Sequence, residues 1–201
     1  MIKVLIAEDA RIPHETLAAV LELEEDLAVV ATVERGDEVV PAAIGSAPDV
    51  AVIDIDLPEV DGLTAAASLR EKLPGCRSLV LTGLAKPGYL RRAVACGVTG
   101  FVFRHSPPGD LIAAIRKVAA GEQVVDPRLA VAALRRADNP LAAREADVLR
   151  LAATGAEPDE IAVRLSLSKG TVRNYLSSAV VKLNARSRVD AIRIASDEGW
   201  I

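Results

Sequence analysis

Aromatic residues and cysteines are scarce in this sequence. Its 201 residues include two Phe, two Tyr, one Trp and two Cys, whereas hydrophobic residues of all kinds make up 51%. A core of this composition is built mainly from Val, Leu and Ala, and so much hydrophobic residue excludes a largely disordered chain. Cys76 and Cys96 lack the spacing of a metal site or a redox pair, so we interpret both as small core residues.

Long hydrophobic runs are also missing. No stretch approaches the roughly 18 to 20 apolar residues that a membrane-spanning helix needs. The first residues, MIKVLIAED, pass directly from a strand-like run into acidic residues, which is unlike a secretory signal. We therefore expect a cytoplasmic protein without membrane insertion.

Charge is distributed unevenly along the chain. The formal net charge is -4, yet residues 164–193 contain a run of basic residues interrupted by one acid, Asp190. The basic residues of this run are Arg164, Lys169, Arg173, Lys182, Arg186, Arg188 and Arg193. Such asymmetry indicates a polyanionic partner for this region, although a basic run is also typical of a solvated helix surface.

The first 120 residues alternate β-branched runs with segments of helical spacing. The predicted strands are residues 2–7, 27–33, 50–55, 78–82 and 100–103. Most of them are almost continuously apolar, as expected for strands covered on both faces, and each precedes ten or more residues with helical spacing. Five βα units predict a doubly wound, five-stranded parallel sheet over residues 1–120.

Strand patterns stop after Gly121. Residues 121–140 contain two prolines and one short helical run, residues 128–136, so we interpret residues 121–138 as a linker that carries a helix. Residues 139–201 have helical spacing in four short segments with tight connections. They predict a small, all-α domain of four helices.

Polar residues occupy the ends of the predicted strands. In an open α/β sheet, ligands bind outside the carboxyl ends of the strands, where the loops converge. The residues at these ends are Glu8, Asp9, Asp54, Thr82 and Arg104. The fold would therefore bring three carboxylates, a hydroxyl and a cation into one pocket.

This combination indicates metal-assisted phosphate chemistry. Three carboxylates repel one another unless a cation lies between them, and oxygen ligands favour Mg²⁺. A carboxylate beside magnesium can act as a nucleophile toward phosphorus and form an aspartyl phosphate. Taken singly, Asp9 could be a helix cap and Asp54 a loop residue. Their shared position at strand ends favours Asp54 as the phosphoacceptor.

The same residues resemble a known family. Glu8 and Asp9, the stretch VIDIDLPEVDG around Asp54, and the segments LTGLAKPGY and GFVFRHSP are similar to the flavodoxin-like receiver domain of bacterial two-component response regulators. The resemblance implies that a sensor histidine kinase transfers a phosphoryl group to Asp54, and that Thr82 and Phe101 form a switch pair. It also implies magnesium ligands, which are Glu8, Asp9, Asp54 and the backbone carbonyl of Asp56.

One position departs from the receiver pattern. These domains ordinarily have a lysine where this sequence has Arg104. A planar guanidinium reaches its partners differently from a compact ammonium, but the positive charge is kept. We expect phosphorylation to survive this change, with an altered rate or lifetime.

Residues 161–184 read as helix, tight turn, helix. The apolar residues of the two helices are spaced to pack together, and Ser168 is placed to cap the second helix. The residues that we expect to contact DNA are Ser168, Lys169, Thr171, Arg173, Asn174 and Lys182. Arg can bond guanine and Asn adenine in the major groove, whereas Lys and Ser contacts to phosphate set the register.

The second domain also resembles a known family. The stretches READVLRLAATG and EIAVRLSLSKGTVRNYLSSAVVKLNARSRVDAIRIASDEGW are similar to the LuxR-type helix-turn-helix DNA-binding domain. Together with the receiver, they resemble a response regulator of the NarL/FixJ family, and LAKPGYLRRAV is most similar to its DesR branch. A threonine usually precedes the first helix of such domains, and here Ala142 takes its place and cannot cap.

These observations predict a transcription regulator rather than an enzyme. Phosphorylation at Asp54 is expected to promote homodimerisation and binding to double-stranded promoter DNA. One alternative is a regulator gated by a ligand or partner without phosphate, which Arg104 favours. Another is a phosphatase that uses Asp54 and Asp56 as a DxD pair, although that motif belongs on the first strand and leaves the second domain unexplained.

Overall fold

A computed structural model describes residues 1–84, 86–134 and 139–201, and the chain forms two compact units. The first unit contains the parallel sheet and the second contains the helices after residue 139. Each unit has its own hydrophobic cluster. Within the described part of the chain, no helix has both the length and the hydropathy of a bilayer-spanning segment.

The first unit alternates strands and helices. The strands are β1 (Ile2–Ala7), β2 (Leu27–Val33), β3 (Val50–Asp54), β4 (Arg77–Thr82), β5 (Gly100–Phe103) and β6 (Val124–Val125). The helices are α1 (Arg11–Glu22), α2 (Val39–Ser46), α3 (Gly62–Lys72), α4 (Pro87–Ala95), α5 (Pro108–Ala119) and α6 (Pro127–Leu134), with a 3₁₀ turn, η1, at Gly36–Glu38. The five predicted strands are confirmed within one residue at each end.

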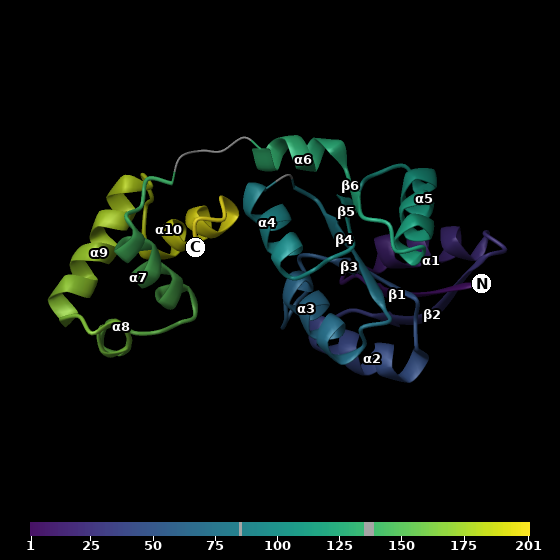
Figure 1. The fold of residues 1–201 in the computed structure, drawn as a ribbon, viewed down its shortest axis with the longest axis horizontal. Coiled ribbons are helices and arrows are strands. Elements are labelled where there is room, and N and C mark those ends of the chain that lie inside the picture. The colour runs from purple at the N-terminus through teal and green to yellow at the C-terminus, as the bar shows by residue number, and fades with distance from the viewer. Residues whose placement is uncertain (85, 135–138) are drawn as a thin grey trace. The chain divides into compact units, whose positions relative to one another are not determined.

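The sheet has the order β2-β1-β3-β4-β5-β6, and all of its strand pairs are parallel. Helices α1 and α5 cover one face, while α2, α3 and α4 cover the other (Figure 1). The residues of β3 are all buried, because this strand lies inside the sheet and is covered on both sides. The carboxyl ends of β1, β3, β4 and β5 therefore lie side by side at one edge.

The predicted number of strands was wrong. The sheet has a sixth strand, β6, which pairs with β5 through Gly100↔Val124 and Phe101↔Val125. Its two residues fall in the segment that we expected to be a linker. A strand of this length is too short to show a periodic pattern, and only its pairing with β5 defines it.

The second unit consists of four helices, as predicted. They are α7 (Ala143–Ala153), α8 (Pro158–Leu165), α9 (Lys169–Lys182) and α10 (Arg188–Asp197). Their inward faces form one cluster that includes Leu149, Ile161, Val172, Leu176 and Ala191. Helix α6 corresponds to the predicted linker helix, and the last two residues of that prediction, 135 and 136, lie outside the described residues.

Candidate functional site

The candidate site of the first unit lies at the carboxyl edge of the sheet. Glu8 follows β1, Asp54 ends β3, Thr82 ends β4 and Arg104 follows β5. Glu8, Asp54 and Thr82 are buried. Residues separated by almost a hundred positions in the sequence thus meet in one place, as the predicted topology requires.

Asp54 is a fully buried carboxylate with 0% exposure. Neither of its side-chain oxygens accepts a hydrogen bond from any described residue. Arg104 Nη2 lies 2.8 Å from Asp54 Oδ2, so this contact is an ion pair without the geometry of a directed hydrogen bond. Buried polar atoms in proteins almost always have hydrogen-bond partners, and an exception requires an explanation.

The loop after β3 brings backbone close to Asp54. Asp61 caps α3, because its Oδ1 accepts hydrogen bonds from the backbone N–H groups of Leu63 and Thr64. A Cβ atom at Gly62 would lie 2.0 Å from the carbonyl oxygen of Asp54, so a glycine is needed there. Glu59 has a φ of 64°, in the left-handed region that costs energy for a residue other than glycine. Such strain is concentrated at functional loops.

Arg104 is the cation of the site. Its Nη1 donates to Glu8 Oε1 at 3.4 Å, and its Nη2 lies 2.8 Å from Asp54 and 3.6 Å from Asp56. The Nε of Arg104 is buried and donates to no described residue. One guanidinium therefore faces three carboxylates that come from two different strand ends.

Burial raises the pKa values of both inner carboxyls. The pKa of Glu8 rises to about 7, first because the group is buried and next because the Asp54 carboxylate is nearby. The pKa of Asp54 rises to about 6, again mainly through burial, although the positive charge of Arg104 opposes the shift. Perturbed carboxyls that share a site are typical of functional centres.

The donor set fits a hard divalent cation. Glu8, Asp9 and Asp54 each offer one carboxylate oxygen, and these three atoms lie within 4.8 Å of one another. The two oxygens of Asp54 have no hydrogen bond with a described residue to lose on binding a cation. Oxygen ligands of this kind are preferred by Mg²⁺. Asp56, whose backbone carbonyl was predicted as a further ligand, lies in the loop after β3 with its side chain 59% exposed.

Thr82 and Phe101 occupy neighbouring strands. The hydroxyl of Thr82 donates to the backbone carbonyl of Leu84 at 2.8 Å and accepts from the N–H of the same residue at 3.2 Å. Phe101 lies on β5 and is buried, with its ring inside the unit. The hydroxyl is thus held by its own loop, and the ring of Phe101 is buried on the neighbouring strand.

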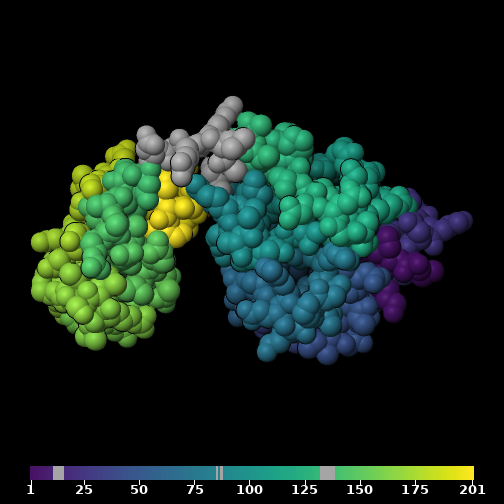
Figure 2. All heavy atoms as spheres, viewed as in Figure 1, coloured from purple at the N-terminus to yellow at the C-terminus, as the bar shows by residue number. Residues whose placement is uncertain are grey.

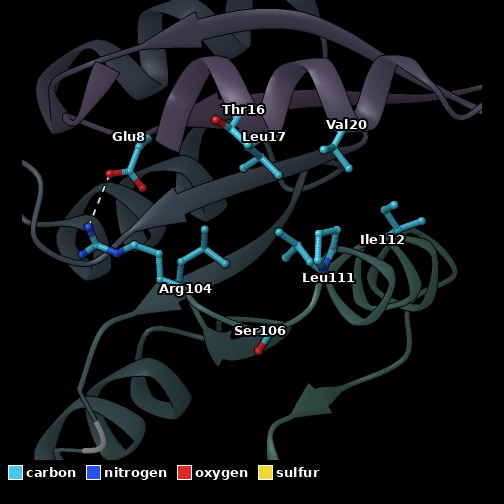
Figure 3. Close-up of a pocket in the computed structure, with 10 residues that line it drawn as sticks. Glu8, Thr16, Leu17, Val20, Arg104, Ser106, Leu111 and Ile112 are labelled. Carbon is cyan, nitrogen blue, oxygen red and sulfur yellow. Dashed lines mark hydrogen bonds and ion pairs between the residues drawn. The ribbon is translucent and has the colours of Figure 1, made fainter. Parts of the chain in front are cut away.

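A largely apolar cavity of about 230 Å³ lies behind Glu8 and Arg104 (Figure 3). It is lined from α1 by Leu17 and from α5 by Leu111 and Ile112, among others. Asp54 does not line it. The largely apolar surroundings disfavour the charged form of Glu8, which is consistent with the raised pKa of that carboxyl.

The candidate DNA-contacting surface of the second unit is formed by α9. Val172, Leu176 and Ala179 are buried on one side of this helix, whereas Arg173 and Asn174 are exposed. The yellow-green atoms of this region are exposed on the visible face of the unit in Figure 2. Among the described residues, Arg173 forms no salt bridge, so its charge is available to a partner.

The N-terminus of α9 is capped as predicted. Ser168 Oγ accepts a hydrogen bond from the backbone N–H of Thr171 at 3.1 Å, and the two hydroxyls lie 2.8 Å apart. Lys169 is exposed, and its Nζ donates to Asp159 Oδ2 on α8 at 2.6 Å. This exposed ion pair is weak in water, so the ammonium can exchange partners.

Lys182 forms an ion pair with another helix of the second unit. Its Nζ donates to Glu145 Oε2 at 2.7 Å, and Ser178 Oγ donates to Glu145 Oε1 at 2.6 Å. Glu145 belongs to α7, is 5% exposed and also accepts a hydrogen bond from the backbone N–H of Ala142. Sequence reasoning missed this buried carboxylate. The acidic residue three positions after the helix start was the available signal, and it predicts the bond to Ala142 but not the contacts with α9.

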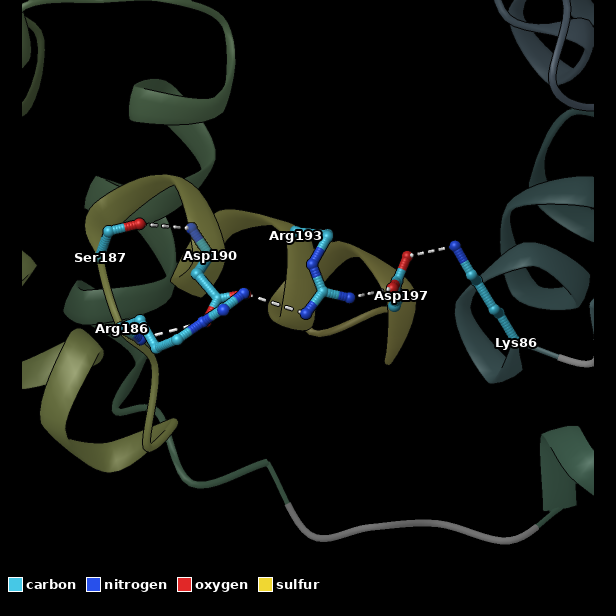
Figure 4. A network of polar contacts seen from close by, with 6 residues as sticks. All are labelled: Lys86, Arg186, Ser187, Asp190, Arg193 and Asp197. Carbon is cyan, nitrogen blue, oxygen red and sulfur yellow. Dashed lines mark hydrogen bonds and ion pairs between the residues drawn. The ribbon is translucent and has the colours of Figure 1, made fainter.

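Acidic side chains of α10 form ion pairs with nearby arginines. Arg193 contacts Asp190 at 2.9 Å and Asp197 at 3.2 Å, and Arg186 contacts Asp190 at 3.4 Å (Figure 4). Hydrogen bonds from the Arg186 backbone and from Arg193 lower the pKa of Asp190 to about 2. Acidic neighbours therefore neutralise part of the basic run, and among the described residues Arg173 is the basic residue of α9 without a salt bridge.

Helix α7 begins without a side-chain cap. Ala142 has no side-chain oxygen, so only the reverse half of a capping box is formed, through Glu145. Asn139 Oδ1 accepts a hydrogen bond from the backbone N–H of Leu141 at 3.0 Å. This bond orders the turn before α7 but does not pair an N–H group of the helix itself.

Comparisons with known proteins cover both units. A family model for the response regulator receiver domain matches residues 4–116, and a model for bacterial regulatory proteins of the luxR family matches residues 139–195. The transcriptional regulatory protein DesR of Bacillus subtilis is 40% identical over 200 residues, which cover 100% of this chain and 99% of DesR. The uncharacterized transcriptional regulatory protein YvfU of the same organism is 42% identical over the full length of both chains.

A solved structure gives the same result for the fold. The two-component response regulator RcsB, in a complex with DNA, has a TM-score of 0.68 and 25% identity, and the match covers 98% of each chain. The predicted family resemblance is therefore confirmed.

Proposed function

Because this chain belongs to the NarL/FixJ family of two-component response regulators, with a receiver domain and a LuxR-type DNA-binding domain, we propose that Asp54 accepts a phosphoryl group from a sensor histidine kinase. The observation that carries the proposal is the state of Asp54 itself. Its carboxylate is fully buried, accepts no hydrogen bond from the described residues and lies beside Glu8, Asp9 and Arg104. A buried carboxylate without hydrogen bonds, close to a cation and to further carboxylates, is typical of a group that reacts or binds a ligand.

The transfer step follows from this arrangement. An oxygen of Asp54 attacks the phosphorus of a phosphohistidine, and the new P–O bond forms as the P–N bond breaks. The departing imidazole nitrogen keeps the electron pair of that bond and takes up a proton from water. Arg104 Nη2, already 2.8 Å from Asp54 Oδ2, lies where it can offset charge on the phosphoryl oxygens.

Magnesium would be held by Glu8, Asp9, Asp54 and the backbone carbonyl of Asp56, and it would supply further positive charge to the phosphoryl oxygens. Thr82 would then exchange its bonds to Leu84 for one to the phosphoryl group. This change would shift the receiver toward a form that associates as a homodimer.

For the second domain, we propose binding to double-stranded promoter DNA through α9. Arg173 and Asn174 project from its exposed side and would contact base edges, while Ser168, Lys169 and Thr171 at its N-terminus would contact phosphate. A dimer would place two such helices on adjacent half-sites. Lys182 was predicted to join this surface, but its bond to Glu145 favours a structural role.

The test is an intact-mass measurement of the full chain after incubation with MgCl₂ and acetyl phosphate. We expect one added phosphoryl group, which Asp54→Asn abolishes and Asp56→Asn retains. Asp56 is a matched control because it lies two residues away and is exposed. A phosphoryl group that persists in Asp54→Asn would contradict the assignment.

The same experiment addresses a regulator that works without phosphate. Arg104 in place of the usual lysine is the feature that favours this alternative. If the parent stays unmodified with acetyl phosphate and Arg104→Lys becomes modified, the arginine has removed the phosphoryl chemistry. A phosphatase is disfavoured by topology, because the Asp54 and Asp56 pair follows the third strand along the chain, not the first.

A further inference from the structure

Arg104 holds carboxylates that the proposed cation would also need. Its Nη1 donates to Glu8 Oε1 at 3.4 Å, and its Nη2 lies 2.8 Å from Asp54 Oδ2. Glu8 and Asp54 are two of the three residues whose oxygens converge within 4.8 Å. A divalent cation placed among these oxygens would therefore meet a guanidinium that already neutralises part of their charge.

The forked shape of the guanidinium allows Arg104 to compete with a divalent cation for both carboxylates. Its two terminal nitrogens form a fixed fork, so Arg104 engages Glu8 with one and Asp54 with the other at the same time. A lysine ammonium is a single point on a shorter side chain. To contact both Glu8 and Asp54 it would have to lie between their oxygens, because it does not present two separate nitrogens to them.

The contacts of Arg104 are not saturated. Both oxygens of Asp54 and the Nε of Arg104 are buried and form no hydrogen bond with described residues. The 2.8 Å contact is therefore held by charge, with little directional bonding to lose when the ions change partners. The 3.4 Å bond to Glu8 is long and correspondingly weak.

From these observations we propose that Arg104 is the resting counter-ion of the acidic cluster and must release Glu8 before Glu8 can ligate a divalent cation. Arg104 thereby lowers the affinity of the site for that cation and sets the concentration at which the receiver becomes competent. The proposal rests on the proposed function, in which Glu8, Asp9 and Asp54 hold magnesium.

The test is Mg²⁺ binding to the full-length, unphosphorylated chain, measured by isothermal titration calorimetry for the parent and Arg104→Lys. The substitution keeps the charge, so general attraction of the cation by the acidic cluster is unchanged. We expect Arg104→Lys to bind Mg²⁺ about three- to five-fold more tightly, which corresponds to loss of the one long hydrogen bond between Arg104 and Glu8. A second readout is the increase in the unfolding free energy on adding Mg²⁺, measured by urea unfolding.

Two controls make the result specific. Arg116→Lys changes another forked arginine of the same unit, which pairs with Glu24 and Asp26 on the surface, and it should leave Mg²⁺ affinity unchanged. In a Glu8→Gln background, the affinity is expected to be lower overall and the gain from Arg104→Lys is expected to disappear. A double-mutant cycle of this kind isolates the coupling between the two side chains.

The outcomes separate the two proposals. If the parent binds Mg²⁺ and is phosphorylated on Asp54, but Arg104→Lys binds no more tightly, the competition is refuted while the proposed function stands. An equal gain with and without the Glu8→Gln change also refutes it, because the effect would not pass through Glu8. If the parent neither binds Mg²⁺ nor accepts a phosphoryl group, both proposals fail.

Discussion

Asp54 in the receiver domain and Glu145 in the DNA-binding domain are both buried carboxylates, but their surroundings differ. Glu145 accepts hydrogen bonds from the backbone of Ala142, the hydroxyl of Ser178 and the ammonium of Lys182. Asp54 accepts none from the described residues and has one close ion pair, with Arg104. Burial alone would raise the pKa of both, yet the bonds from Lys182 and Ser178 hold that of Glu145 below its usual value.

This difference indicates that Glu145 has a structural role and that Asp54 has a chemical one. A buried carboxylate with all of its bonds made joins two helices and resists change. A buried carboxylate without them costs stability, and such a cost persists where the group is needed for function. Four predictions test this contrast.

The largest effect is expected on unfolding. Glu145→Ala should lower the unfolding free energy of the second domain by about 3 kcal/mol, because it leaves the backbone N–H of Ala142 and the hydroxyl of Ser178 without their partner and removes the ion pair of the partly exposed Lys182. Asp54→Ala should change that of the receiver by less than about 1 kcal/mol, because no hydrogen bond with a described residue is lost and relief of the buried charge offsets the lost ion pair with Arg104.

Urea unfolding can report the second domain separately. Trp200 is the single tryptophan of the chain and packs against the second hydrophobic cluster, so its fluorescence follows that domain. Glu160→Ala is a matched control, since Glu160 has the same helix-start role on α8 but is exposed. Equal losses for Glu145→Ala and Asp54→Ala in their own domains would remove the distinction.

The two domains should also respond oppositely to acid. The folded-state pKa values of Glu8 and Asp54, about 7 and about 6, lie above their unfolded values. The folded receiver therefore binds more protons between about pH 4 and pH 7, and its stability must fall as the pH rises through this window. We expect the receiver to gain about 2 kcal/mol on going from about pH 7.5 to pH 5.5 without divalent cations.

The second domain has the reverse sign, because the pKa of Asp190 is lowered to about 2. Its stability is present above the unfolded pKa and is lost as the pH falls from about 4 toward 2. Urea unfolding at several pH values, with circular dichroism for the whole chain and Trp200 fluorescence for the second domain, measures both trends. Asp54→Asn should shrink the receiver's gain, and an unchanged gain would assign it to other groups.

A smaller effect distinguishes two cations of α9. Arg173→Ala should weaken binding to a duplex by about ten-fold and reduce the salt dependence by about one released ion. Lys182→Met should leave the salt dependence unchanged and instead destabilise the domain, because it removes the partner of Glu145. Fluorescence anisotropy with a labelled duplex at several salt concentrations measures the first effect. A similar loss of salt dependence in Lys182→Met would return that residue to the DNA surface.

The smallest effect concerns the start of α7. Ala142 has extended backbone angles suited to a cap but no side-chain acceptor. Ala142→Thr should raise the unfolding free energy of the second domain by about 1 kcal/mol, because the hydroxyl can accept from the Glu145 N–H. Ala143→Thr, one residue inside the helix, should give no gain in the same Trp200 assay.

Most of the fold and much of the candidate site could be predicted from local patterns. Strands such as Leu27–Val33 and Gly100–Phe103 were predicted at their observed ends, because apolar runs and the following helical spacing are properties of consecutive residues. The convergence of Glu8, Asp54, Thr82 and Arg104 followed from topology, since parallel strands in such a sheet end at the same edge. The two-residue β6 could not be predicted, because its pairing with β5 is a long-range contact.

The sequence by itself determined which residues lie at the strand ends, which face of α9 carries Arg173 and Asn174, and where its cap Ser168 lies. Only the tertiary structure decided which charged side chains form ion pairs with other elements of the protein. Lys182 and Arg173 look alike in the sequence, yet one reaches Glu145 on another helix and the other has no ion-pair partner among the described residues. Likewise, the side chain of Arg104 takes its partners from β1 and β3. Hydrogen bonds and ion pairs of this kind depend on distances between elements, which a pattern along one element does not contain.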